Sequence, residues 1–194
     1  MTQAITRLYD NRMHAEQAMQ ALRSAGLTDE QVSIVANRGS DTVTDPETVS
    51  DAGEGAATGA GIGGAVGAGA GLLAGVGLLA IPGIGPVVAA GWLAATALGA
   101  VAGAATGGAA GGLIGSLTSD GMSEAHANVY AEGIRRGGSM VTARVPDERE
   151  GEVRRILDSY PSVEPTARGE EYRRDGWQRF DDTAAPYTPS ARRN

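Results

Sequence analysis

The sequence predicts an α+β protein in which a split sandwich of strands and helices is interrupted by a hairpin of two long, antiparallel helices. Two observations lead to this prediction. No charged residue occurs between Glu54 and Asp120, although the chain carries 16 basic and 23 acidic residues. The segments on either side of this gap repeat the same order of strand, helix and strand. A single uniform domain would spread its charges along the chain, so residues 55–119 are predicted to form a separate unit.

The segment before the apolar unit has the pattern of a βαβ motif. Residues 4–9 are predicted to form a strand, and the apolar side chains that follow recur at helical spacing. Asp10 or Asn11 can cap this helix by accepting a backbone N–H bond, and Gly26 suits its C-terminal end. The β-branched run at residues 32–36 completes the motif as a second strand.

The segment after the apolar unit repeats this order behind an additional helix, Ser123 to Arg136. Residues 140–145 are predicted to form a strand, and Pro146 opens a helix whose apolar side chains form one buried stripe. A weaker strand at 163–168 contains a proline and therefore belongs at a sheet edge. Together the two halves predict a four-stranded, ferredoxin-like split βαβ sandwich.

The chain therefore divides into five predicted parts: the first βαβ half at 1–37, an acidic linker at 38–54, the helical hairpin at 55–119, a helix plus the second βαβ half at 120–168, and a flexible, arginine-rich tail at 169–194. The linker is expected to be a solvated loop. The tail contains the aromatic residues Tyr172, Trp177 and Phe180, which predict docking on a partner, such as a groove of a neighbouring subunit, as the alternative to disorder.

Glycines at four-residue spacing predict that the two hairpin helices touch through their backbones. The predicted helix–helix interface consists of Gly59, Gly63, Gly67, Gly71 and Gly75 on the first helix and Gly91, Gly99, Gly103, Gly107 and Gly111 on the second. The predicted hairpin turn consists of Pro82, Gly83, Gly85 and Pro86. Each glycine inside a helix costs about 1 kcal/mol relative to alanine, so close backbone contact has to offset this loss. A flexible, glycine-rich linker is the alternative interpretation of the segment.

The predicted hairpin is too long and too apolar to stand in water by itself. Both helices exceed the roughly 20 residues that cross a bilayer, and two crossings would place both flanks on one side. However, the flanking residues are acidic, and neither the positive-inside signal nor an aromatic belt is present. Insertion in a lipid bilayer and burial between subunits of a soluble oligomer both remain open, and each includes self-association.

Composition narrows the classes of function. The chain has no cysteine and two histidines, so we assign no catalytic, cofactor-binding or metal-binding residue. A net charge of −7 argues against nucleic acid as a partner, because phosphate backbones attract clustered basic residues. Gly59, Gly61 and Gly64 match the dinucleotide pattern GxGxxG, but no strand precedes them. A pocket that gathers polar groups would instead indicate a small-ligand sensor, and its candidate members are Arg7, His14, Glu132 and Arg144.

The sequence also resembles a bacterial family, the heat-induced or general stress proteins of the YflT type. The resemblance rests on the helix ending at Gly26, the glycine spacing from Gly55, the turn Ile81-Pro82-Gly83-Ile84-Gly85-Pro86 and the helix before Gly137-Gly138, and it covers about residues 3–146. It implies a stress-induced protein, frequently associated with membranes, without catalytic residues.

These observations predict a non-enzymatic stress-response protein that assembles through its glycine-zipper hairpin. We expect it on the cytoplasmic side of the inner membrane, with the lipid bilayer as a partner, or in the cytoplasm as a soluble homo-oligomer. A ferredoxin-like sensor of a small ligand is the remaining alternative.

Overall fold

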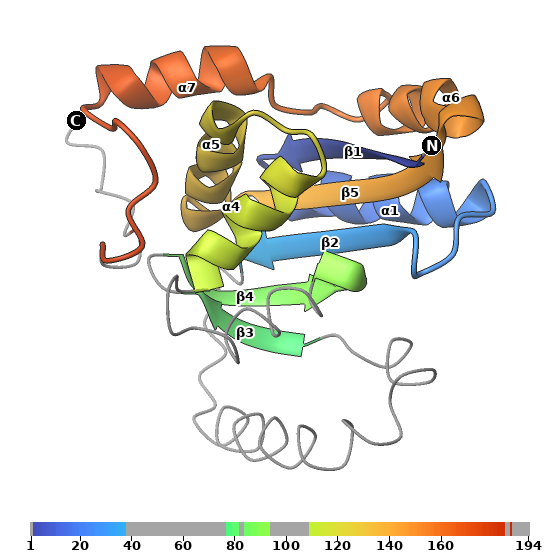
Figure 1. Cartoon of the computed structure of the whole chain (residues 1–194), viewed down its shortest axis with the longest axis horizontal. Helices are drawn as coiled ribbons and strands as arrows, with labels where there is room; N and C mark the ends of the chain where they lie inside the picture. The colour runs from blue at the N-terminus through green and yellow to red at the C-terminus, as the bar shows by residue number, and fades with distance from the viewer. Residues whose placement is uncertain (1, 38–76, 82–83, 94–108, 185–186, 188–194) are drawn as a thin grey trace, which may run out of the picture.

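One antiparallel sheet organises the chain. The computed structural model describes residues 2–37, 77–81, 84–93, 109–184 and 187. In this part of the chain five strands follow the order β1-β5-β2-β4-β3 (Figure 1). The strands are β1 (Thr2–Tyr9), β2 (Val32–Asn37), β3 (Gly77–Ile81), β4 (Gly85–Ala90) and β5 (Ser139–Pro146). The helices are α1 (Arg12–Ser24), α4 (Ala109–Ser119), α5 (Glu124–Arg135), α6 (Asp147–Asp158) and α7 (Pro165–Arg174). The α+β class is therefore confirmed.

Helices cover both faces of the sheet and divide the core into two layers. Figure 1 shows α4 and α5 in front of the strands and α1 behind them. On the α1 and α6 face, Leu22 and Leu157 are fully buried together with Val141 of β5. On the opposite face, Leu117 of α4 and Ile134 of α5 pack in the second cluster. β1 and β3 form the two edges of the sheet.

The predicted first βαβ motif is confirmed. β1 and β2 each pair antiparallel with β5, so they run parallel to each other with β5 between them, and α1 connects them. The Asn11 side chain accepts a hydrogen bond of 2.8 Å from the N–H of Met13, which caps α1. Gly26 follows the helix with a φ of +85°, a conformation that favours glycine.

The second motif follows the prediction only as far as its helix. β5 and α6 lie where they are expected, but the strand predicted at 163–168 consists of one bridge between Val163 and Leu8. Pro165 has no backbone N–H to extend the pairing and occupies the first turn of α7 instead. The carboxylate of Glu164 accepts hydrogen bonds from the N–H groups of Thr166 and Ala167, so the sequence caps a helix at this position.

The predicted helices of the hairpin are wrong at residues 77–80 and 87–90, where the chain forms the antiparallel strands β3 and β4. β4 also pairs with β2 and so provides hydrogen-bond partners for the backbone of β2, which a helix at residues 85–90 would leave unpaired on that side. The adjacent β-branched residues Val87 and Val88 favour this conformation. The N–H of Ile84 donates to the carbonyl of Ile81 at 3.0 Å, and the chain reverses direction there between two strands.

Of the ten glycines predicted to form the helix–helix interface, the described part of the chain includes two, Gly91 and Gly111. Gly85 and Pro86 belong to β4, and Gly111 belongs to α4. Gly91 follows β4 with a φ of +86°, which is incompatible with a helix. The remaining predicted positions, Gly59, Gly63, Gly67, Gly71, Gly75, Pro82, Gly83, Gly99, Gly103 and Gly107, lie outside the described residues.

The described part of the tail, residues 169–184 and 187, packs on its own chain, although the sequence predicts a flexible segment or docking on a neighbour. Residues up to Arg174 continue α7, and Tyr172 and Phe180 are buried. Trp177 packs edge-on against Tyr172, with 5.6 Å between the ring centroids. The guanidinium of Arg136 lies 4.2 Å from the centroid of Tyr172, which joins this segment to the end of α5. Contacts far apart in the sequence therefore order it.

Candidate functional site

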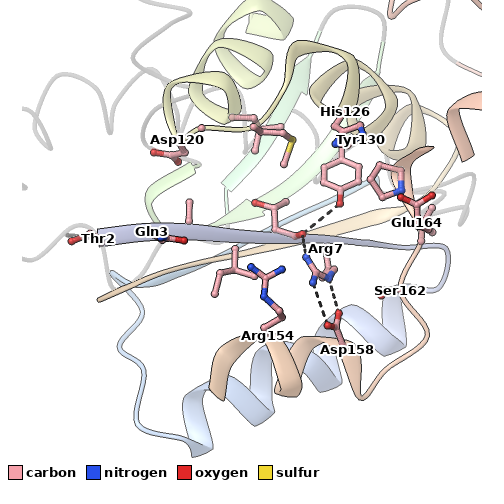
Figure 2. A pocket seen from close by; sticks show the side chains of 18 residues that line it. Thr2, Gln3, Arg7, Asp120, His126, Tyr130, Arg154, Asp158, Ser162 and Glu164 are labelled. Atoms are coloured by element: carbon pink, nitrogen blue, oxygen red, sulfur yellow. Dashed lines mark hydrogen bonds and ion pairs between the residues drawn. The ribbon is translucent and has the colours of Figure 1, made fainter. Parts of the chain in front are cut away.

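A polar groove of about 700 Å³ runs along the outer edge of β1. Six consecutive residues of that strand, Thr2 to Arg7, line it. One wall carries Tyr130 of α5, and the other carries Asp158 of α6. Figure 2 shows both side chains directed toward Arg7, which lies between the two helices. The groove is therefore built on a strand edge, with helices from both faces of the sheet as walls.

The backbone of β1 is partly occupied along this edge. The Thr6 carbonyl accepts hydrogen bonds from Arg7 Nη1 at 3.0 Å and from the Tyr130 hydroxyl at 3.4 Å. The Leu8 carbonyl accepts one from the N–H of Val163 at 2.7 Å. Backbone groups alternate in direction along an antiparallel strand, so those of Thr2 and Ala4 also face outward. Among the described residues, none forms a hydrogen bond with them on that side.

Most of the charged groups that line the groove are held in ion pairs, either within the groove or with residues beside it. Arg7 forms a bidentate ion pair with Asp158, at 2.6 and 3.2 Å, and this hydrogen bond raises the pKa of the guanidinium. Asp120 accepts from Arg144 at 2.7 Å, and the Arg144 guanidinium lies 3.3 Å from the centroid of Trp92. Paired charges hold the walls in place and favour a polar partner that forms hydrogen bonds.

The pKa values of two further groove residues, Tyr130 and Glu164, are shifted by their surroundings. Burial raises the pKa of Tyr130 to about 12, so its hydroxyl keeps its proton at neutral pH and remains a donor. Backbone hydrogen bonds from Ala167 and Thr166 lower the pKa of Glu164 and keep this carboxylate ionised. His126 lies at the groove with Nε2 3.5 Å from the hydroxyl oxygen of Thr166. At neutral pH the groove thus presents a protonated phenol and an ionised carboxylate.

The four polar residues proposed as a sensor cluster do not meet. Arg7 lines the groove, whereas Arg144 pairs with Asp120 but is not part of the lining, and His14 lies on α1. Glu132 is 1% exposed and binds Arg135 and Arg136 at the far end of α5. Sequence reasoning missed the groove because only the arrangement of strands shows that β1 is at an edge. The early proline in the segment 163–168 was the one local signal that the neighbouring strand would be incomplete.

No group of three or more histidine or acidic side chains within the described residues has the geometry of a metal site. The described helices also include none with the length and hydropathy to span a bilayer. Comparison with protein-family models, curated proteins and solved structures gives no match.

Proposed function

We propose that this chain is a non-enzymatic protein that self-assembles, and that the edge of β1 takes part in the assembly. The observation that carries the proposal is the groove in which the outward backbone groups of Thr2 and Ala4 have no hydrogen-bond partner among the described residues. An edge strand with unpaired donors and acceptors is a template for another strand. Most sheet edges are shielded from such pairing, so an open one is a candidate interface.

We further propose that the scaffold is a ferredoxin-like split βαβ sandwich with a reduced fourth strand. Two features support this assignment: β5 lies between the parallel strands β1 and β2, and the chain returns through α6 to the outer side of β1. At that position only Val163 pairs with Leu8 before α7 begins. In this interpretation, the groove is the part of the fourth-strand position that the chain itself does not fill.

Binding is a better explanation of the groove than catalysis. The charges of Arg7, Asp158, Asp120 and Arg144 are neutralised in ion pairs. Tyr130 holds its proton at neutral pH and therefore does not act as a base. Groups in this state provide hydrogen bonds and shape, which suits recognition of a backbone or another neutral polar surface.

The stress-response role and the association with a membrane remain proposals that rest on the sequence. Lipid contact is proposed for the charge-free segment 55–119, most of which lies outside the described residues. Washing membranes with carbonate separates the two locations: a protein retained in the pellet supports insertion, and a fully released protein supports the cytoplasmic assembly.

Light scattering over a range of concentrations, without detergent, tests self-assembly. We expect a mass that rises above the 19.6 kDa of one chain as the concentration increases. A mass that stays at 19.6 kDa up to about 1 mM, the weak end of specific association, refutes the proposal.

A small-ligand sensor is the second candidate, favoured by the volume of the groove, which falls within the range of roughly 300–1,000 Å³ that is typical of ligand sites. Citrate and inorganic phosphate are suitable probes, because Arg7 and Arg154 line the groove and an anion would compete with Asp158 and Glu150 for their guanidinium groups. Saturable binding that the substitution Arg154→Ala weakens would support this candidate. Binding that is absent, or equal in both proteins, would reject it for these anions.

A further inference from the structure

We propose that the partner of the β1 edge is the β1 edge of a second copy, paired antiparallel across a twofold axis near Ala4 to give one continuous sheet. This inference rests on the proposed self-assembly and names its interface. In this arrangement the N–H and carbonyl groups of Ala4 bind those of Ala4 in the second copy. Thr2 of each copy lies opposite Thr6 of the other.

The first argument is that this end of β1 lacks the features that usually prevent edge pairing. Residues 2–5 contain no charge and no proline, and their register with β5 is continuous, without a bulge. The protection begins further along: Arg7 and Tyr130 cover the Thr6 carbonyl, and Val163 covers Leu8. Pairing is therefore confined to the start of the strand, where Figure 1 shows β1 at the edge of the sheet.

The second argument is that the pairing can form without breaking the short hydrogen bonds of the groove. The Thr6 carbonyl receives a bond of 3.0 Å from Arg7 and a long one of 3.4 Å from Tyr130. A carbonyl oxygen accepts two hydrogen bonds, so the N–H of Thr2 from the second copy would replace the long one. The Tyr130 hydroxyl, which keeps its proton, can turn toward the groove.

The third argument is the charge pattern of α6, which forms one wall of the groove. Its first turn contains the acidic residues Asp147, Glu148 and Glu150 together with Arg149, whereas Arg154 and Arg155 lie near its C-terminal end, where Arg7 neutralises Asp158. Within one copy Arg154 pairs with Glu150 and Arg149 with Glu152, so the pairing across the axis exchanges the first of these contacts for one with the second copy. A twofold axis perpendicular to the sheet sets the two α6 helices antiparallel, since each packs on its own β1. The acidic start of one helix then faces the basic end of the other. This complementarity holds for a second copy and would be a coincidence for an unrelated peptide.

The substitution Ala4→Pro tests the backbone pairing. The N–H of Ala4 faces outward, so proline removes the proposed intermolecular bonds and leaves the ladder to β5 intact. Ala4→Ser keeps the N–H and is the matched control. Sedimentation equilibrium should show the dissociation constant raised by at least about tenfold in Ala4→Pro and changed by less than about twofold in Ala4→Ser, as expected for loss of central backbone bonds.

A charge exchange tests the helix contact. One variant carries Glu148→Arg and Glu150→Arg, and the other carries Arg154→Glu and Arg155→Glu. Each variant alone should associate more weakly than the unaltered protein, because like charges face each other. An equimolar mixture should recover the association, because the mixed pair restores opposite charges. Thermal unfolding of each variant checks that it is folded.

The outcomes separate this inference from the function it rests on. A wild-type protein that remains a monomer refutes both. A protein that associates, but with the same dissociation constant in Ala4→Pro and with no recovery in the mixture, assembles through another surface and refutes the β1 interface alone.

Discussion

Replacing Gly91 by alanine distinguishes the strand structure of residues 85–91 from the helix that the glycine spacing predicts. In a helix, alanine would be more favourable than glycine by about 1 kcal/mol. In the structure, Gly91 has a φ of +86°, and a Cβ atom would lie 2.3 Å from the Val32 carbonyl oxygen and 2.9 Å from Ser33 Cα. The two conformations therefore predict changes of opposite sign in the free energy of unfolding.

Two contributions set the size of the destabilisation that Gly91→Ala should cause. A side chain in the left-handed region costs about 1–2 kcal/mol. The clash adds about 1–3 kcal/mol, since both contacts are with backbone atoms of β2 that cannot rotate away. The backbone there is also fixed by Ser33, whose hydroxyl donates to the Ala90 carbonyl at 2.8 Å and accepts from the N–H of Leu93. We expect Gly91→Ala to destabilise the protein by about 2–5 kcal/mol.

Gly26→Ala is the control, because Gly26 has nearly the same φ, +85°, with no atom within 4 Å of the added Cβ. It should cost only the conformational part, about 1–2 kcal/mol. Urea denaturation of the three proteins, followed by circular dichroism, gives the free energies of unfolding. A Gly91→Ala protein that is as stable as the wild type, or more stable than Gly26→Ala, would contradict the strand and its contact with β2.

Three other perturbations address the helices, the buried phenol and the C-terminal segment. Gly151→Ala, at an exposed and unobstructed site in α6, should stabilise the protein by about 0.5–1 kcal/mol. Gly133→Ala should destabilise it by about 1–2 kcal/mol, because the added Cβ would lie 2.3 Å from Cδ2 of the buried Leu8. Urea denaturation measures both free energies of unfolding, and equal effects would contradict the packing of α5 on β1. Burial raises the pKa of Tyr130 to about 12, whereas the pKa in the unfolded chain is about 10, so the stabilising contribution of the neutral phenol is complete below pH 10 and is lost as the pH rises to 12. Between pH 8 and pH 11 the free energy of unfolding should therefore fall more steeply for the wild type than for Tyr130→Phe. Parallel pH profiles of the two proteins would argue against burial. Phe180→Ala should lower the free energy of unfolding by about 2–4 kcal/mol, because this side chain is 6% exposed within the core beneath α5. A thermal unfolding transition that the substitution leaves unchanged would support the flexible tail that the sequence predicts.

The sequence alone determined the elements whose signals are local. The cap at Asn11 and the apolar side chains Ile5, Leu8 and Tyr9 of β1 are signals from residues within a few positions of each other. The apolar spacing that buries Val153 and Leu157 on α6 is local in the same sense. Such patterns act before any tertiary contact forms, so they predicted α1, α5, α6 and three of the strands in the sheet.

The tertiary structure decided the features that depend on distant partners. Residues 77–80 and 87–90 border the glycine rows and are predicted as the ends of the hairpin helices, but pairing of β4 with β2 and β3 supplies backbone hydrogen bonds that favour strands. Phe180 is ordered by the N–H bond that Asn128 accepts and by the core beneath α5. The groove exists because the segment after Val163 turns into α7 and leaves the edge of β1 incomplete. Whether an edge is open depends on the order of strands in the whole sheet, and no local stretch of sequence contains that information.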